Sequence, residues 1–134
     1  MPNSQIQFYL VDDNDIDLAV NTKLIQLSGL PCVVNPYRNC TDFQNAIHAG
    51  LLSTDARLRL LLLDIQMPVM GGFEFLEHLL KVQPDVLKHF QVFMLSANID
   101  REQIDRASNF PFIHRLLEKP LDAYQLKQLV STLC

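Results

Sequence analysis

The most apolar segment of the chain is residues 59–64, which read Arg-Leu-Leu-Leu-Leu-Asp. A strand buried on both faces of a parallel sheet has such a continuous apolar pattern, and its carboxyl end opens onto the binding crevice. The segment therefore predicts a central strand that presents Asp64 at a functional edge. A second apolar run, residues 8–11 (Phe-Tyr-Leu-Val), is followed in the same way by Asp12 and Asp13. Two expected strand ends thus carry three carboxylates.

Outward from these two runs, the chain alternates between strand and helix patterns. The patterns predict strands over 5–11, 32–37, 59–64, 91–96 and 112–117, and helices over 15–27, 41–52, 73–82, 100–108 and 122–133. Such alternation is typical of a parallel sheet covered by helices on both faces. Five units in one small domain favour an α/β, flavodoxin-like (βα)5 doubly wound fold with strand order 2-1-3-4-5. That order places the first and third strands side by side, and with them Asp13 and Asp64.

Local signals give expectations for individual helices. Residues 41–44 (Thr-Asp-Phe-Gln) and 100–103 (Asp-Arg-Glu-Gln) read as capping signals at the start of the second and fourth helices. One apolar face is expected on the first helix and on the third, as in helices that pack on a core. The expected members are Ile16, Val20, Leu24 and Leu27 in the first helix, and Phe75, Leu76, Leu79 and Leu80 in the third.

Composition and charge narrow the class of protein. The chain has 134 residues, of which 49% are hydrophobic and 19% charged, which indicates a globular domain rather than a disordered chain. A net charge of −4 without a basic stripe argues against a nucleic-acid partner. No signal peptide or membrane-spanning apolar run is present in the sequence, so we expect a cytoplasmic protein with no membrane partner. The expected organisation is a single domain over residues 1–134 with no output domain.

The three cysteines, Cys32, Cys40 and Cys134, are widely spaced and form no C-x-x-C pair. A disulfide framework or a zinc site would require paired spacing. We therefore expect three reduced thiols.

Polar residues with complementary chemistry follow the other expected strands. Three carboxylates that meet at one sheet edge repel one another, and a hard cation such as Mg²⁺ would offset that repulsion. Ser96 follows the fourth strand and Lys119 follows the fifth, which adds a hydroxyl and a cation at two more strand ends. The combination indicates a site for phosphoryl chemistry.

These residues form four short motifs in a fixed order. They are Asp12-Asp13, Asp64 followed by residues 67–72 (Met-Pro-Val-Met-Gly-Gly), Ser96-Ala97 and Lys119-Pro120. Together they resemble the signature of response-regulator receiver domains, the CheY-like phospho-accepting modules of two-component and phosphorelay signalling. The resemblance extends from about residue 6 to residue 133.

The resemblance implies a phosphoacceptor and a magnesium site. Asp64 would accept a phosphoryl group from a phosphohistidine of a sensor histidine kinase or a histidine phosphotransfer protein. Asp13 would bind Mg²⁺ directly and Asp12 through water, and Asp64 and the backbone carbonyl of Gln66 would complete the protein ligands. Mn²⁺ could substitute for Mg²⁺.

The resemblance also implies roles for the residues around Asp64. Lys119, the Ser96 hydroxyl and the backbone amide of Ala97 would bind the phosphoryl oxygens. Pro68 and Gly72 are better explained by the sharp loop after Asp64 than by a chemical role. Receivers often have a cis bond at the Lys-Pro junction, which makes the bond before Pro120 a candidate.

Leu116 is the main departure from the family pattern, because receivers usually have Tyr or Phe three residues before the lysine. That ring turns inward when the Ser or Thr hydroxyl moves onto the phosphate, and Leu116 cannot reproduce its movement. Either the switch is read out differently, or the face formed by the fourth helix, fifth strand and fifth helix responds more weakly.

The leading hypothesis is a stand-alone receiver that signals to a downstream protein by phosphorylation-dependent contact, with a phosphorylation-dependent homodimer as a further partner. Such a protein is not an enzyme beyond its own phosphorylation and dephosphorylation. The alternative is a degenerate receiver that acts as a phosphorylation-independent interaction module, and a fragment of a longer hybrid protein also stays open. A phosphatase with an aspartyl-phosphate intermediate would typically carry D-x-D-x-T/V after the first strand, with the leading Asp as nucleophile. Here the run is Asp12-Asp13-Asn14-Asp15, and such an enzyme would leave Asp64 without a role. A flavin-binding protein would need a phosphate loop after the first strand instead of three acids.

Overall fold

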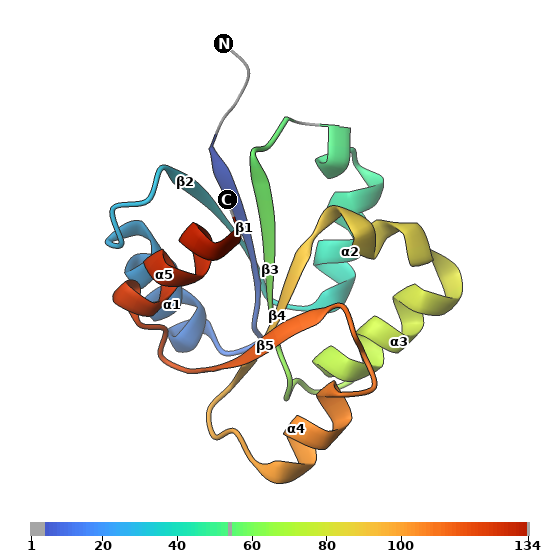
Figure 1. The fold of residues 1–134 in the computed structure, drawn as a ribbon. Coiled ribbons are helices and arrows are strands. Elements are labelled where there is room, and N and C mark those ends of the chain that lie inside the picture. Colours follow the sequence, from blue (N-terminus) through green and yellow to red (C-terminus); the bar gives the residue numbers. More distant parts are fainter. Residues whose placement is uncertain (1–4, 54, 134) are drawn as a thin grey trace.

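Five parallel strands form one sheet in the computed structural model, which describes residues 5–53 and 55–133 (Figure 1). The strands are β1 (Ile6–Val11), β2 (Cys32–Tyr37), β3 (Leu58–Asp64), β4 (Gln91–Ser96) and β5 (Ile113–Glu118). Their order in the sheet is β2-β1-β3-β4-β5, and all four neighbouring pairs are parallel. The predicted fold class and strand order are confirmed. Cys134 lies outside the described residues.

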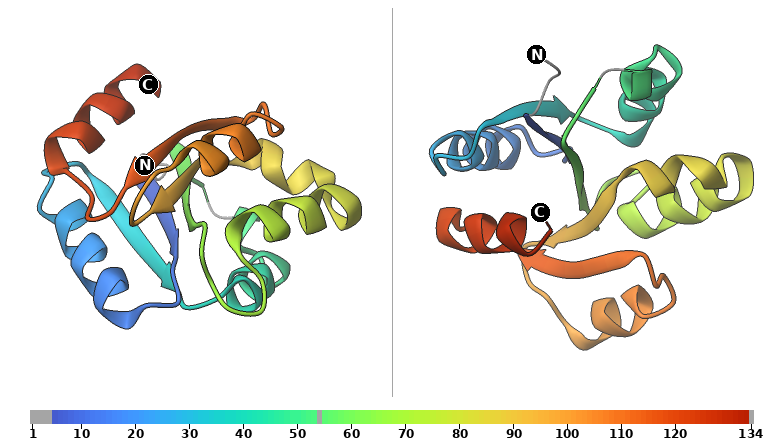
Figure 2. Two further views of the ribbon diagram at one scale, coloured as in Figure 1. Left: turned by 90° about the horizontal axis from the view of Figure 1, so that it is seen from below. Right: turned by 45° about the horizontal axis from the view of Figure 1, so that its top comes forward.

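Helices cover both faces of this sheet (Figures 1 and 2). The α-helices are α1 (Asp15–Gln26), α2 (Cys40–His48), α3 (Gly72–Val82), α4 (Arg101–Ala107) and α5 (Ala123–Leu133), and short 3₁₀ segments span η1 (Leu51–Ser53) and η2 (Pro84–His89). Side chains of α1 and α5 pack on one face of the sheet, and those of α2, α3 and α4 pack on the other. Across residues 5–53 and 55–133, every helix is too short or too polar to span a bilayer.

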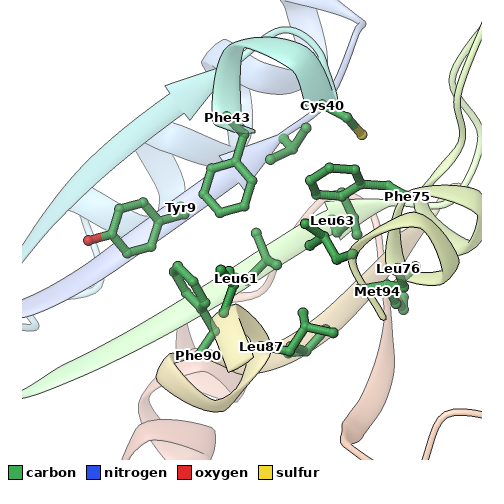
Figure 3. Close-up of a cluster of buried hydrophobic side chains, with 14 of the residues drawn as sticks. Tyr9, Cys40, Phe43, Leu61, Leu63, Phe75, Leu76, Leu87, Phe90 and Met94 are labelled. Carbon is green, nitrogen blue, oxygen red and sulfur yellow. The ribbon is translucent and has the colours of Figure 1, made fainter. Parts of the chain in front are cut away.

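The core follows from the alternation of side chains along the central strands. Successive strand residues point to opposite faces, so Leu60 and Leu62 face α1 and α5, whereas Leu61 and Leu63 face α2 and α3. All four leucines are fully buried. On the second face, Figure 3 shows Phe43 of α2 among Tyr9, Phe75 and Phe90 in the larger of the two buried clusters. The ring centroids of Phe43 and Phe90 lie 5.7 Å apart in a T-shaped arrangement, a favourable geometry for aromatic pairs.

The apolar face expected for α1 is wrong in three of its four positions. Ile16 and Leu27 are 74% and 67% exposed, and Val20 is also exposed. The buried residues of α1 are Leu18, Asn21 and Ile25. The buried face differs from the expected one because it includes a polar residue, Asn21. The Asn21 side chain accepts a hydrogen bond from the Leu121 backbone N–H at 2.8 Å, which connects α1 to the segment after β5.

Two further local expectations need correction. Residues 41–44 do not cap α2, because the helix begins at Cys40 and the Asn39 side chain accepts the Asp42 N–H at 2.7 Å. Leu80 of α3 is exposed rather than part of the core. By contrast, Asp100 caps α4 as predicted, accepting the Gln103 N–H at 2.9 Å.

The edge strands of the sheet, β2 and β5, differ from the central strands in composition. Pro36 lies opposite Leu10 in the β1–β2 pair. The Tyr37 carbonyl accepts the Asp12 N–H at 3.0 Å and so points toward β1. Because successive residues alternate in direction, Pro36 is turned to the free edge. On β5, His114 and Arg115 are exposed.

In the turn after β3, the backbone at Gly72 lies close to the backbone of Asp64 and Ile65. The Gly72 N–H donates to the Ile65 carbonyl at 3.1 Å, which folds the segment after Asp64 back on itself. A Cβ atom at Gly72 would lie 2.5 Å from the Asp64 carbonyl oxygen and 2.7 Å from Cε of Met94. Glycine is therefore required by this close approach.

We expect Gly72→Ala to lower the free energy of unfolding by about 1–3 kcal/mol, because the added methyl group overlaps the Asp64 backbone and forces the turn to shift. Urea denaturation followed by circular dichroism measures the change. Lys81→Ala, an exposed substitution in the same helix, is the control and should alter stability by less than about 0.5 kcal/mol. Equal midpoints for the Gly72→Ala variant and the wild type would contradict the predicted overlap.

Candidate functional site

The carboxyl ends of the strands meet at the end of the sheet that is lowest in Figure 1. Asp12 and Asp13 follow β1, and Asp64 is the last residue of β3. Ser96 ends β4 and Lys119 follows β5, and the Lys119 N–H donates to the Ser96 carbonyl at 2.8 Å. The strand order therefore places all of these residues at one edge.

Lys119 is the centre of a group of carboxylates. Its Nζ atom lies 3.0 Å from Oδ2 of Asp12, 3.0 Å from Oδ2 of Asp17 and 3.5 Å from Oδ1 of Asp64. The side chains of Lys119, Asp12 and Asp64 are almost completely buried, and that of Asp17 is about half-buried. The sequence predicted three members of this group and missed Asp17. A usable signal was its position in the first turn of a helix that begins directly after the acidic pair.

The acidic residues fit a hard divalent cation. One oxygen from each of Asp12, Asp13 and Asp64 lies within 4.8 Å of the other two. Oxygen ligands in such a cluster are what Mg²⁺ prefers, and Mg²⁺ needs few protein ligands because it keeps several waters. Asp12 is fixed by accepting the Asn14 N–H at 3.0 Å, and Asp13 is exposed.

The two oppositely charged centres of the site perturb each other. Burial raises the pKa of Asp64 to about 7, and the Asp12 carboxylate contributes, while Lys119 and the Gln66 backbone amide counteract the rise. Burial by itself lowers the pKa of Lys119, yet hydrogen bonds to Asp17 and Asp12 raise the pKa of this ammonium group above its ordinary value. The lysine is thus fully charged, whereas Asp64 is poised to lose its proton near neutral pH.

The Ser96 hydroxyl has two hydrogen-bond partners. It donates to Oε1 of Gln103 in α4 at 2.8 Å and accepts the Asn98 backbone N–H at 3.2 Å. Both Ser96 and Gln103 are buried. The sequence indicated Gln103 only as the last residue of a capping signal, because its partner lies on a different element.

A cavity of about 270 Å³ brings most of the predicted site residues together. It is lined by Asp13, Asn14, Asp17, Asp64, Gln66, Ser96, Ala97 and Lys119. Asp12 is completely buried beside Lys119 rather than lining the cavity.

The remaining predicted residues lie outside this cavity. Pro68 lines a neighbouring cavity of about 590 Å³, and Gly72 begins α3. Leu116 lies in β5 and lines a separate apolar hollow beside α4. The Lys119–Pro120 bond is cis, as the resemblance implied.

Comparison with known proteins gives a consistent result. The family described as the response regulator receiver domain matches residues 8–131. A response regulator receiver protein from Dyadobacter fermentans is 35% identical, with a TM-score of 0.76 over 95% of this chain and 96% of that chain. A two-component response regulator from Cytophaga hutchinsonii, 20% identical, shares the fold with a TM-score of 0.83 over 97% of both chains. Chemotaxis protein CheY4 from Vibrio cholerae is also 20% identical, with a TM-score of 0.71 over 98% of this chain and 100% of that chain.

The raised pKa of Asp64 predicts how stability changes with pH in metal-free protein. An unfolded chain releases this proton near pH 4 and the folded protein near pH 7, so the folded state binds more protons between these values. The contribution of Asp64 to the free energy of unfolding therefore falls as pH rises through this window, by at most about 1.4 kcal/mol per pH unit for one proton.

Urea denaturation at pH 5, 6, 7 and 8 in EDTA measures this effect. The Asp64→Asn variant lacks the titrating group, so we expect its stability relative to the wild type to increase from pH 5 to pH 7 and to level off above the pKa of Asp64. A difference between the two proteins that is independent of pH would contradict the assignment.

Proposed function

The chain belongs to the response regulator receiver domain family, and we propose that Asp64 is its phosphoacceptor in a Mg²⁺-dependent reaction. Receivers of this family are signalling modules of two-component systems. The observation that carries the proposal is the position of Asp64 in one cavity with Lys119, Ser96 and Asp13. A carboxylate, a cation, a hydroxyl and a further metal-binding carboxylate thus surround one point where a phosphoryl group can be attached.

The proposed step transfers a phosphoryl group from a phosphohistidine of a sensor histidine kinase or a histidine phosphotransfer protein. A carboxylate oxygen of Asp64 attacks phosphorus, the new O–P bond forms, and the P–N bond breaks with its electron pair going to the imidazole, which takes up a proton from solvent. The product is an acyl phosphate, and attack by water on its phosphorus restores the Asp64 carboxylate and releases phosphate.

Positioning and charge stabilisation are the main requirements of phosphoryl transfer. Asp13 and Asp64, with Asp12 through water and the backbone carbonyl of Gln66, would hold the metal ion. The chemistry that Mg²⁺ supplies when bound is neutralisation of the phosphoryl and carboxylate charges, and Mn²⁺ is expected to substitute.

The phosphoryl oxygens are expected to bind three groups of the protein. Lys119 supplies a charged donor, Ser96 supplies a hydroxyl, and the Ala97 backbone supplies an amide. Lys119 is charged in the unphosphorylated protein because its carboxylate partners raise its pKa. It is therefore ready to bind the incoming phosphoryl group without a change in protonation.

We propose that the readout is a phosphorylation-dependent contact with a downstream protein, and that phosphorylation promotes a homodimer. We expect the protein to be phosphorylated and to act in the cytoplasm. Ser96 and Lys119 connect the site to the ends of β4 and β5, so the elements that follow these strands are expected to respond. The chain is expected to act on no substrate other than its own phosphoryl group.

Incubation with acetyl phosphate and Mg²⁺, followed by intact-mass measurement, tests the phosphoacceptor. We expect one phosphoryl group on the wild type and none after addition of EDTA. We expect none on Asp64→Asn, because that variant has no carboxylate at position 64 to attack phosphorus. Asp85→Asn, which alters an exposed carboxylate of η2, is the matched control and should be labelled like the wild type.

Two results would contradict the proposal. Label on Asp64→Asn would place the acceptor at another residue. Absence of label on the wild type in the presence of Mg²⁺ would instead favour the phosphorylation-independent interaction module.

A further inference from the structure

The Ser96 hydroxyl is already committed to another residue in the unphosphorylated protein. Its hydrogen is donated to Gln103 Oε1 at 2.8 Å, and its oxygen accepts the Asn98 N–H. A serine hydroxyl has a single hydrogen to donate. Donation to a phosphoryl oxygen on Asp64 therefore requires that the bond to Gln103 breaks.

Gln103 cannot lose this bond without consequence. Its side chain is buried, and a buried carbonyl oxygen left without a donor is unfavourable. The residue lies in the first turn of α4, where its backbone N–H is bound by the side chain of Asp100. Breaking the Ser96–Gln103 hydrogen bond therefore removes a contact that holds the first turn of α4.

The surroundings of Gln103 give its side chain an alternative position. Gln103 lines the cavity of about 590 Å³ between α4 and the segment after β3, together with Gln66, Glu74 and Arg106. Two of these lining residues, Arg106 of α4 and Glu74 of α3, form an ion pair with each other. A released Gln103 amide can turn into this polar space and regain hydrogen bonds with water.

We propose that Gln103 is a positioning residue that holds the Ser96 hydroxyl away from Asp64 until a phosphoryl group arrives, and that its release loosens α4. This inference rests on the proposed phosphorylation of Asp64. It also supplies a readout that needs no aromatic ring at Leu116. The hydrogen bond that is exchanged, rather than a ring that turns inward, connects the phosphoryl group to α4.

The inference predicts a direction and a size for the effect of removing Gln103. Breaking a buried neutral hydrogen bond opposes phosphoryl binding by about 2- to 10-fold in affinity. The Gln103→Leu variant has no acceptor for the Ser96 hydroxyl. It should therefore bind the acyl-phosphate analogue beryllofluoride, in the presence of Mg²⁺, about 2- to 10-fold more tightly than the wild type.

A double-mutant cycle separates this role from a merely structural one. Beryllofluoride is titrated with Mg²⁺ into the wild type, Gln103→Leu, Ser96→Ala and the double variant, and binding is followed through backbone amide resonances. The gain from Gln103→Leu should vanish in the Ser96→Ala background, because no hydroxyl remains to be released. Gln103→Glu keeps an acceptor oxygen and should show no gain.

Two further variants serve as a control and as a replacement for Gln103→Leu. Gln128→Leu makes the same substitution on α5, where the glutamine side chain bonds only the exposed Tyr124 hydroxyl in the described residues, and should leave affinity unchanged. Gln103→Met removes the amide at similar side-chain length, and completes the cycle if Gln103→Leu does not fold.

Amide hydrogen exchange supplies the second readout. Beryllofluoride should speed exchange within Arg101–Ala107 of the wild type by several-fold, because α4 loses the Ser96–Gln103 bond, and should change the same amides little in Gln103→Leu. Unchanged exchange in the wild type despite binding would overturn the inference. Equal affinities of the wild type and Gln103→Leu, or an equal gain in the Ser96→Ala background, would also overturn it. Failure of the wild type to bind beryllofluoride with Mg²⁺ would instead overturn the proposed function, and the inference with it.

Discussion

The accumulation of carboxylates around Lys119 is the constraint on which the rest of the site depends. The strand order brings Asp12 against Asp64, and burial of the strand ends removes the water that would otherwise separate their charges. Lys119 offsets these effects only in part, since burial, with a contribution from the Asp12 carboxylate, still raises the pKa of Asp64. An arrangement of this kind is unfavourable for the isolated fold and favourable for any positive charge that enters. The apolar layers on both sides of β3 supply the stability that lets the protein retain it.

The groups expected to bind phosphate are occupied before phosphate arrives. Lys119 contacts Asp17 of α1, and Ser96 contacts Gln103 of α4. If Asp64 is phosphorylated as proposed, these groups must exchange partners rather than simply gain contacts. Because α1 and α4 cover opposite faces of the sheet, the proposed exchange would involve both helical layers.

Sequence reasoning succeeded where the information is local and failed where it is not. Continuous apolar runs such as residues 60–63 defined the strands to within one residue at each end. The residues expected at the strand ends, Asp13 and Asp64, line one cavity, and their roles stay predictions. The face of α1 was mistaken because a buried position is held by Asn21, whose partner at Leu121 is 100 residues away. The contact of Asp17 with Lys119 was missed for the same reason, because it joins residues 102 apart. Gln103 is only seven residues from its partner Ser96, but the two lie on different elements, α4 and β4, so a capping signal alone did not indicate their hydrogen bond. The expectation for Leu116 stays a prediction.

Pro36 has a consequence for how copies of this protein meet. An edge strand with free N–H and C=O groups is a template to which a strand of another molecule can add, the first step of β-type aggregation. Pro36 removes a donor from the outer side of β2, and the exposed His114 and Arg115 place bulky, polar side chains on β5. Both borders of the sheet thus resist continuation into a neighbouring molecule. Contacts between copies of the protein are thereby disfavoured at the strand edges and left to the helical surfaces.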